Sequence, residues 1–203
     1  MLKNTSPQSH NSTAPGSVPD PVLDAIRALP GRQERILVAI DGRCGSGKTT
    51  LATRLQETLP CRVFHMDDFF LQPCQRTPER LQLPGENVDH ERFLQEVLLP
   101  ASRGDTVRYR PYLCSRQALG PAVEVPPERL TLVEGSYACH PALWPYYDLR
   151  IFLTIDPGEQ LRRIGLRSGP DKLRQFKDRW IPLEEQYFRA FSLPERCDLL
   201  LKI

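Results

Sequence analysis

In the segment Gly42–Thr49, Gly42, Gly47, Lys48 and Thr49 occupy the fixed positions of the pattern G-x-x-x-x-G-K-[ST], which is typical of a phosphate-binding loop. Its glycines let backbone N–H groups turn inward around a phosphate, and the positive end of a following helix adds to the attraction. Lys48 would then reach the β- and γ-phosphates, and the Thr49 hydroxyl would ligate Mg²⁺. The pattern predicts a nucleoside triphosphate site, taken as ATP with GTP left open, and Mg²⁺ as cofactor. The expected nucleotide-binding residues of this segment are Gly42, Arg43, Cys44, Gly45, Ser46, Gly47, Lys48, Thr49 and Thr50.

Carboxylates follow two other apolar runs. Asp67 and Asp68 come after the run 61–66, and Glu134 ends the run that starts at residue 130. In an open parallel sheet, the carboxyl ends of the strands share an edge with the phosphate loop. Asp67 or Asp68 is therefore placed to accept the proton of an acceptor hydroxyl, while the other caps a turn. Together with the loop, Glu134 is placed to hold Mg²⁺ directly or through water.

Three arginines, Arg162, Arg163 and Arg167, follow Asp156-Pro157 on a predicted helix. Guanidinium groups on a mobile helix suit a lid, over about 157–172, that closes over a triphosphate. A charged face turned to solvent is the alternative explanation.

The Pro-rich region of about 71–125 is predicted to shape the acceptor site. Arg108, Tyr109 and Tyr112 mix cations with aromatic rings and could face an acceptor molecule, or else pack a hairpin. Asp89 is interpreted from its position as a helix cap. The four histidines show no metal-ligand spacing, and none is assigned to catalysis.

Strands and helices alternate along the chain, which predicts an α/β fold with a parallel β-sheet covered by helices on both faces, and an Arg-rich lid helix. We expect one domain over 21–203 after a disordered tail over 1–20. The expected strands are 36–40, 61–66, 130–133, 149–155 and 199–201, with a hairpin of 107–109 and 122–125. The expected helices are 21–29, about 49–59, 88–99, 158–167 and 172–191, the last broken or kinked near Pro182.

The bulk composition excludes several classes of protein. The 203 residues carry a net charge of +2, which gives no general attraction to nucleic acid or an anionic membrane. No apolar run approaches the roughly 20 residues of a membrane span. The six cysteines form no C-x-x-C pair, so we expect free thiols and a cytoplasmic protein. Cys44 could have a pKa lowered by the nearby N–H groups, or could simply fill a variable position of the loop. The oligomeric state stays open.

These segments together resemble the uridine kinase and phosphoribulokinase family of P-loop kinases. The matching pieces are 42–49, 66–70, 87–89, 109–112, 132–135 and 161–167, which occur in the family's order and span most of 35–200. The piece 66–70 is also similar to the nicotinamide riboside kinase branch. The resemblance implies the fold of a P-loop NTPase.

The resemblance also implies roles for individual residues. Asp67 corresponds to the catalytic base, which also contacts the acceptor, and Lys48 stabilises the transferring phosphoryl group. Glu134 corresponds to the acid that helps to hold Mg²⁺, and Asp89 to a residue that contacts ribose hydroxyls. The lid arginines that contact the phosphates correspond to Arg162, Arg163 and Arg167.

The predicted function is an ATP- and Mg²⁺-dependent kinase that phosphorylates a hydroxyl of a nucleoside-like or related small acceptor. A pyrimidine-reading pocket is not recognisable in 71–125, so the acceptor is left open. The alternative is a regulatory P-loop protein, an ATPase or switch. Against it, the chain lacks an Asn-Lys-x-Asp element, and its central strand ends in Glu134-Gly135 rather than Asp-Glu. A relative that binds ligand without transferring phosphate is disfavoured by the intact Lys48, Thr49, Asp67 and Glu134.

Overall fold

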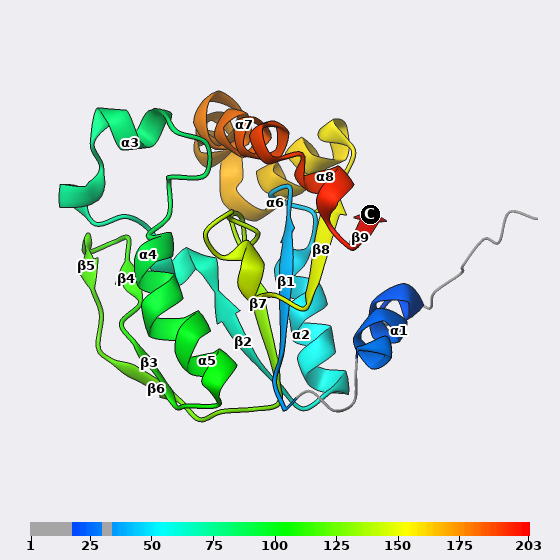
Figure 1. Cartoon of the computed structure of the whole chain (residues 1–203). Helices are drawn as coiled ribbons and strands as arrows, with labels where there is room; N and C mark the ends of the chain where they lie inside the picture. The colour runs from blue at the N-terminus through cyan, green and yellow to red at the C-terminus, as the bar shows by residue number, and fades with distance from the viewer. Residues whose placement is uncertain (1–17, 30–33) are drawn as a thin grey trace, which may run out of the picture.

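A five-stranded parallel sheet runs through the middle of the molecule in the order β2-β7-β1-β8-β9 (Figure 1). The computed structural model describes residues 18–29 and 34–203. Every residue of β1 and β7 is buried, as expected for interior strands of a sheet that is covered on both faces. The strands are β1 Ile36–Gly42, β2 Cys61–His65, β7 Leu130–Glu134, β8 Leu149–Thr154 and β9 Leu199–Lys202.

Helices cover both faces of the sheet, which confirms the predicted α/β architecture. On one face, β1 packs through Val38 and Ile40 against α1 (Asp20–Ala28) and α2 (Lys48–Thr58). On the other face, Ala39 belongs to a second core. That core includes residues of α4 (His90–Phe93), α5 (Leu99–Arg103), α7 (Ile181–Phe191) and α8 (Leu193–Arg196), and of the π-helical turn Leu94–Leu98.

The register of the strands brings three chain segments to one edge of the sheet. Glu134 pairs with Ile40 of β1 and with His65 of β2, so the ends of these strands lie next to each other. Gly42 at the end of β1 pairs with Leu153, and a Cβ there would stand 2.1 Å from the Leu153 carbonyl oxygen. With φ at +134°, this position requires glycine. The first glycine of the phosphate motif is thus fixed by strand packing.

The long helical segment after β8 is interrupted at two places. One is the predicted gap between the expected helices 158–167 and 172–191, and the other lies close to Pro182. Helix α6 (Pro157–Gln175) contains Gly169 at φ 79° and ψ 172°, a conformation that no helix allows, and Pro170 follows. The chain then continues through the π-helical turn Phe176–Trp180 into α7. Pro182 lies in the first turn of α7, directly after this π-helical turn, so the regular α-helix is interrupted near Pro182 as predicted.

The region 71–125 contains more regular structure than predicted. A short helix α3 (Pro78–Gln82) lies in the Pro-rich stretch for which no helix or strand was expected. The predicted hairpin is present as β3 (Val107–Tyr109) paired antiparallel with β6 (Val123–Val125). A smaller pair, β4 (Tyr112–Leu113) and β5 (Ala118–Leu119), lies between them.

The predicted tail falls mostly outside the described residues, which begin at Val18. Val18 itself is buried against the core and α1 begins at Asp20, ahead of the boundary expected at 21. Within the described ranges, no helix is long and apolar enough to cross a membrane.

Candidate active site

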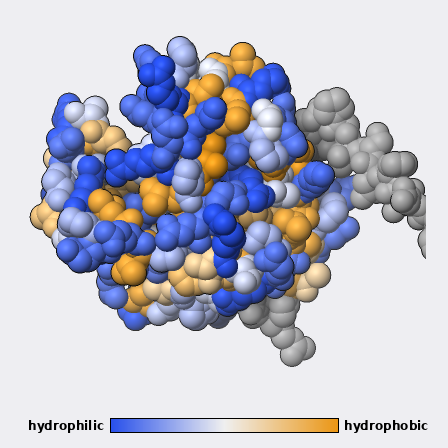
Figure 2. Space-filling view, turned by 90° about the horizontal axis from the view of Figure 1, so that it is seen from above, coloured by the Kyte–Doolittle hydropathy of each residue, from blue (hydrophilic) through white to orange (hydrophobic). Residues whose placement is uncertain are grey.

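A cavity of about 690 Å³ opens at the edge of the sheet where β1, β2 and β7 end. It is lined by the phosphate loop, by the segments that follow β2 and β7, by the 71–125 region and by α6 to α7. Seen from above, the molecule is hollowed between projecting segments whose outer surfaces are largely hydrophilic (Figure 2). One cavity is therefore bounded both by the predicted nucleotide site and by the predicted acceptor region.

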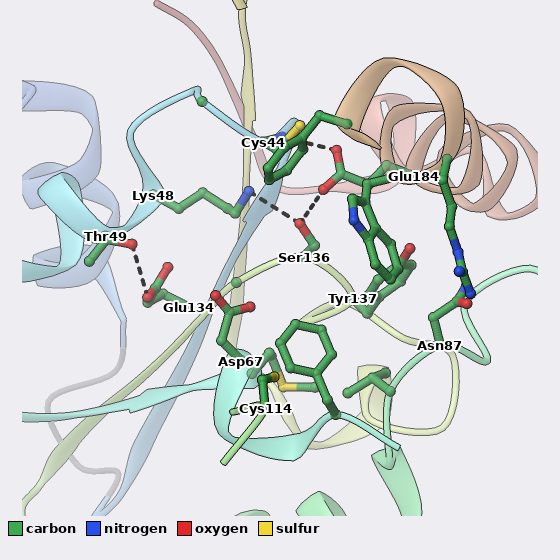
Figure 3. A pocket seen from close by; sticks show the side chains of 18 of the residues that line it. Cys44, Lys48, Thr49, Asp67, Asn87, Cys114, Glu134, Ser136, Tyr137 and Glu184 are labelled. Atoms are coloured by element: carbon green, nitrogen blue, oxygen red, sulfur yellow. Dashed lines mark hydrogen bonds between the residues drawn. The ribbon is translucent and has the colours of Figure 1, made fainter. Parts of the chain in front are cut away.

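Lys48 lies on the cavity wall with its ammonium group drawn onto the loop. Its Nζ donates to the carbonyl oxygens of Gly42 at 2.6 Å and Arg43 at 3.2 Å. A longer contact of 3.5 Å joins Nζ to the hydroxyl of Ser136 (Figure 3). These carbonyl groups hold the ammonium of Lys48 at the loop. The charged oxygens of a phosphate are stronger acceptors for an ammonium than neutral carbonyl oxygens are.

Two side chains of the loop behave differently from expectation. The guanidinium of Arg43 turns away from the cavity and pairs with Glu185, with Nε–Oε1 and Nη2–Oε2 distances of 2.6 and 3.0 Å. It also donates to the Thr154 hydroxyl. Burial, together with the charge of Glu184, raises the pKa of the Cys44 thiol to about 12, so the lowered pKa considered for Cys44 is wrong.

The predicted metal ligands lie together on one side of the cavity. Thr49 Oγ1 donates to Glu134 Oε1 over 3.1 Å, and both residues line the cavity (Figure 3). The same Oε1 lies 2.6 Å from His65 Nδ1, and this hydrogen bond raises the pKa of His65. A hydroxyl and a buried carboxylate are the hard oxygen donors that Mg²⁺ prefers, so this pair fits the ion. Glu134 is followed by Gly135 at φ +136°, where a Cβ would approach Met66 Cβ to 2.8 Å.

The two adjacent aspartates after β2 have separate positions. Asp67 lines the cavity and projects into it between Glu134 and the 71–125 region (Figure 3). Asp68 turns away, because its Oδ2 accepts a hydrogen bond from the Tyr109 hydroxyl at 3.0 Å. Asp67 is accessible from the cavity yet surrounded by protein, and this desolvation, followed by the charge of Glu134, raises its pKa. A raised pKa brings a carboxylate closer to the range useful for a general base.

Two of the three predicted lid arginines reach the cavity. Arg163 and Arg167 line it, whereas Arg162 lies outside, paired with Glu159 at 2.6 Å on exposed helix surface. Arg163 also pairs with Glu159, at 2.7 Å. Arg179, which no sequence pattern singled out, also lines the cavity, from the π-helical turn beyond the expected lid. That the helix moves as a lid stays a prediction.

Apart from Asp67, the residues predicted to contact the acceptor lie beside the cavity rather than in its lining. Asp89 caps α4 by accepting from the Arg92 amide at 3.2 Å, as the position in the sequence suggested. The other carboxylate oxygen of Asp89, Oδ2, accepts a hydrogen bond from Gln75 Nε2 at 2.9 Å. Asp89 is buried and does not line the cavity, so a contact between Asp89 and ribose hydroxyls stays a prediction.

The aromatic and cationic cluster is used in packing. The Tyr109 ring lies in the core, and the Tyr112 hydroxyl accepts from Arg76 Nη2 at 2.8 Å. Arg108 forms an ion pair with Glu124 on the exposed face of the hairpin. The structure therefore matches the hairpin-packing alternative for this segment.

Beneath the loop lies a buried carboxylate, Asp41, that no sequence pattern indicated. Asp41 is fully buried, and its oxygens accept from the amides of Gly42 and Cys139 and from the Tyr187 hydroxyl. Burial raises the pKa of Asp41 to about 6, although these hydrogen bonds act in the opposite direction and lower it. The residue ties β1 to α7 and to the segment after β7, and so fixes the base of the site.

Comparison with known proteins agrees with this geometry. The chain is 25% identical over 190 residues to uridine-cytidine kinase C of Dictyostelium discoideum; the match covers 84% of this chain and 40% of that relative, so the chain spans about two fifths of its length. A possible uridine kinase from Bacillus stearothermophilus superposes with a TM-score of 0.68 at 22% identity, over 90% of this chain and 96% of that one. No protein-family model matches the chain.

A second solved structure is similar in both fold and sequence. This protein, a candidate fructose transport system kinase from a Silicibacter species, has a TM-score of 0.64 and 26% identity, over 89% of this chain and 95% of that one. The fold is thus that of P-loop kinases, and the resemblance to uridine kinase-like proteins drawn from the motifs is confirmed.

Proposed function

We propose that this chain is an ATP- and Mg²⁺-dependent cytoplasmic kinase that transfers the γ-phosphate to a hydroxyl of a nucleoside-like or related small acceptor. The observation that carries the proposal is the shared cavity, because Asp67 and the phosphate loop with Lys48 line the same space. Phosphoryl transfer to an alcohol requires a site that binds the triphosphate and a nearby carboxylate that accepts the proton of the alcohol.

The chemistry follows from these positions. Asp67 accepts the proton of the acceptor hydroxyl as its oxygen bonds to the γ-phosphorus and the bond to the β-phosphate oxygen breaks, which leaves ADP. Lys48, Arg163 and Arg167 donate to the phosphate oxygens and stabilise their charge. Thr49 and Glu134 would hold Mg²⁺, which neutralises charge on the β- and γ-phosphates when it is bound.

An acceptor screen tests this function. Purified protein is incubated with ATP and Mg²⁺ and a panel of nucleosides, sugars and alcohol-bearing cofactor precursors, and ADP release is measured with and without each compound. We expect at least one compound to stimulate ADP release and to appear phosphorylated by mass spectrometry. ATP binding with no acceptor-dependent ADP release across the panel would contradict the proposal.

A further inference from the structure

Ser136 carries a hydroxyl at the cavity that the proposed reaction does not use. The residue follows Glu134 and Gly135 after β7, and it lies between Lys48 and Glu184 (Figure 3). Its Oγ donates to Glu184 Oε1 at 2.5 Å, and Lys48 Nζ lies 3.5 Å from the same Oγ. The hydroxyl thus stands between a carboxylate that can take its proton and the ammonium that is expected to hold the γ-phosphate.

Glu184 is held in the position of a base for this hydroxyl. The residue is only 5% exposed, although it lines the cavity. Its second oxygen, Oε2, accepts from the Cys44 amide of the phosphate loop at 3.0 Å (Figure 3). An activated nucleophile needs a base within hydrogen-bond reach and a third group that orients the base. The Ser136 hydroxyl, the Glu184 carboxylate and the Cys44 amide supply these three parts.

The backbone presents Ser136 on a tight turn at the end of the strand. The residues on both sides have a positive φ, +136° at Gly135 and +72° at Tyr137. A positive φ is uncommon for a bulky residue such as tyrosine, and it persists only where the surrounding structure enforces it. The Cys139 amide anchors this segment by donating to the buried Asp41 at 2.9 Å. Sharp turns after a strand also present the serine nucleophiles of hydrolases at the edge of a sheet.

The other hydroxyl groups of the cavity lining are less suited to attack a phosphate. Thr49 donates to Glu134, the proposed metal ligand. Burial raises the pKa of the Tyr137 hydroxyl. Thr50 is exposed, and no carboxylate of the described residues accepts from its hydroxyl. Ser136 is therefore the lining hydroxyl that combines a base with a neighbouring cation.

We infer that Ser136 is an internal phosphoryl acceptor, which ATP bound in the same molecule phosphorylates. As Ser136 Oγ bonds to the γ-phosphorus, its proton passes to Glu184 Oε1. The bond between the γ-phosphorus and the β-phosphate oxygen breaks, and ADP leaves. This inference rests on the proposed kinase function, because it uses the same ATP site and the same Lys48.

The product is a phosphoserine at the wall of the cavity. A phosphoserine carries a charge of about −1.5 to −2 and three strong acceptor oxygens, so it would pair with Lys48 next to the phosphate loop. There it would compete with the γ-phosphate of a second ATP for the same ammonium. The modification would therefore weaken ATP binding in molecules that hold ATP while no small acceptor is present.

Mass spectrometry tests for the modification. Phosphatase-treated protein is incubated with Mg²⁺ and either ATP or, as control, ADP, with no acceptor present. We expect ATP alone to add the mass of one phosphoryl group, which peptide mapping places on Ser136. The rate per molecule should not change with protein concentration, because the reaction is internal. No incorporation, incorporation at another residue, or a rate that rises with protein concentration overturns the inference.

Variants assign the two roles. Ser136→Ala should incorporate no phosphate. Glu184→Gln should slow incorporation by about 10²-fold or more, because the base is lost. Glu185→Gln makes the same change at the next residue of α7, whose carboxylate pairs with Arg43, and should keep the wild-type rate.

A melting temperature and an ADP Kd close to those of wild type show that a variant is folded. Glu184→Met, with a neutral side chain of similar size, replaces Glu184→Gln if the latter does not fold. Phosphate uptake by folded Ser136→Ala at the wild-type rate overturns the inference. A wild-type rate in the folded Glu184 variant overturns Glu184 as the base.

The two proposals fail in different ways. Phosphoserine at Ser136 without any acceptor-dependent ADP release contradicts the small-molecule kinase function and leaves the inference standing. Acceptor-dependent ADP release by a chain whose Ser136 stays unmodified contradicts the inference and leaves the kinase function standing.

Discussion

Thr49 Oγ1 donates to Glu134 Oε1 over 3.1 Å, although the two residues lie 85 positions apart in the chain. The contact joins the first turn of α2 to the end of β7 and brings two oxygen ligands together at the cavity. If this pair holds Mg²⁺, Glu134→Gln should raise the Mg²⁺ concentration for half-maximal ADP formation about tenfold or more, because the neutral amide is a weaker ligand. Thr49→Ala should act in the same direction.

A titration of ADP formation against free Mg²⁺ at saturating ATP checks this prediction. Unaltered half-saturation in both variants, with folding intact, would exclude these residues as metal ligands. Glu57→Gln, a change on the same helix α2 away from the cavity lining, serves as control.

Asp67 and Asp68 are neighbours in sequence, but the structure gives them different surroundings. Asp67→Asn should lower kcat by about 10²–10⁴, because it removes a general base. Asp68→Asn should lower the melting temperature slightly through its contact with Tyr109 while kcat stays within a few fold. Steady-state kinetics of the two variants, with the acceptor found in the screen, decides between them. Equal losses in both, or a larger loss in Asp68→Asn, would refute Asp67 as the base.

Lys48 and Arg43 provide a similar contrast within the phosphate loop. Lys48→Ala should weaken ADP binding by tenfold or more, since a charge-assisted bond to phosphate contributes about 1.5–3 kcal/mol. Arg43→Ala should leave the ADP Kd within about threefold, because the guanidinium pairs with Glu185 outside the cavity. Titration with a fluorescent ADP analogue measures both. A loss in Arg43→Ala as large as in Lys48→Ala would show that Arg43 reaches the nucleotide.

The sequence was sufficient to predict the parts of the site that local pattern determines. The phosphate loop, Asp67 and Glu134 each follow an apolar strand, and parallel strands necessarily end at one edge, so their meeting could be derived from order alone. The break at Gly169-Pro170 also follows from a local pattern, because a glycine followed by proline interrupts a helix, and it falls in the gap expected between 158–167 and 172–191.

The rest of the site depends on contacts that no local pattern contains. Glu184 reaches the Cys44 amide across 140 positions, and in the sequence it is one acid on an amphipathic helix. Asn87 lines the cavity, although the functional interpretation of this segment, drawn from the family resemblance, concerned the nearby Asp89. The mixture of charge and aromatic rings at Arg108 and Tyr109 looked like a ligand surface because composition does not reveal which side chains a hairpin turns inward.

Asp41 predicts how stability depends on pH. Its pKa rises from 3.8 to about 6 on folding, so between these values the native state binds more protons than the unfolded state. The free energy of unfolding should therefore fall as the pH rises through this window, by on the order of 3 kcal/mol from this residue. The Asp41→Asn variant lacks this contribution. The free energy of unfolding of the wild type minus that of the variant should therefore be most positive near about pH 4, and it should be smaller at about pH 7. Chemical denaturation across this range measures the difference, and a carboxyl ¹³C titration of Asp41 reports its pKa directly. A constant difference, together with a carboxyl that titrates near 4, would show that burial does not hold the proton on Asp41.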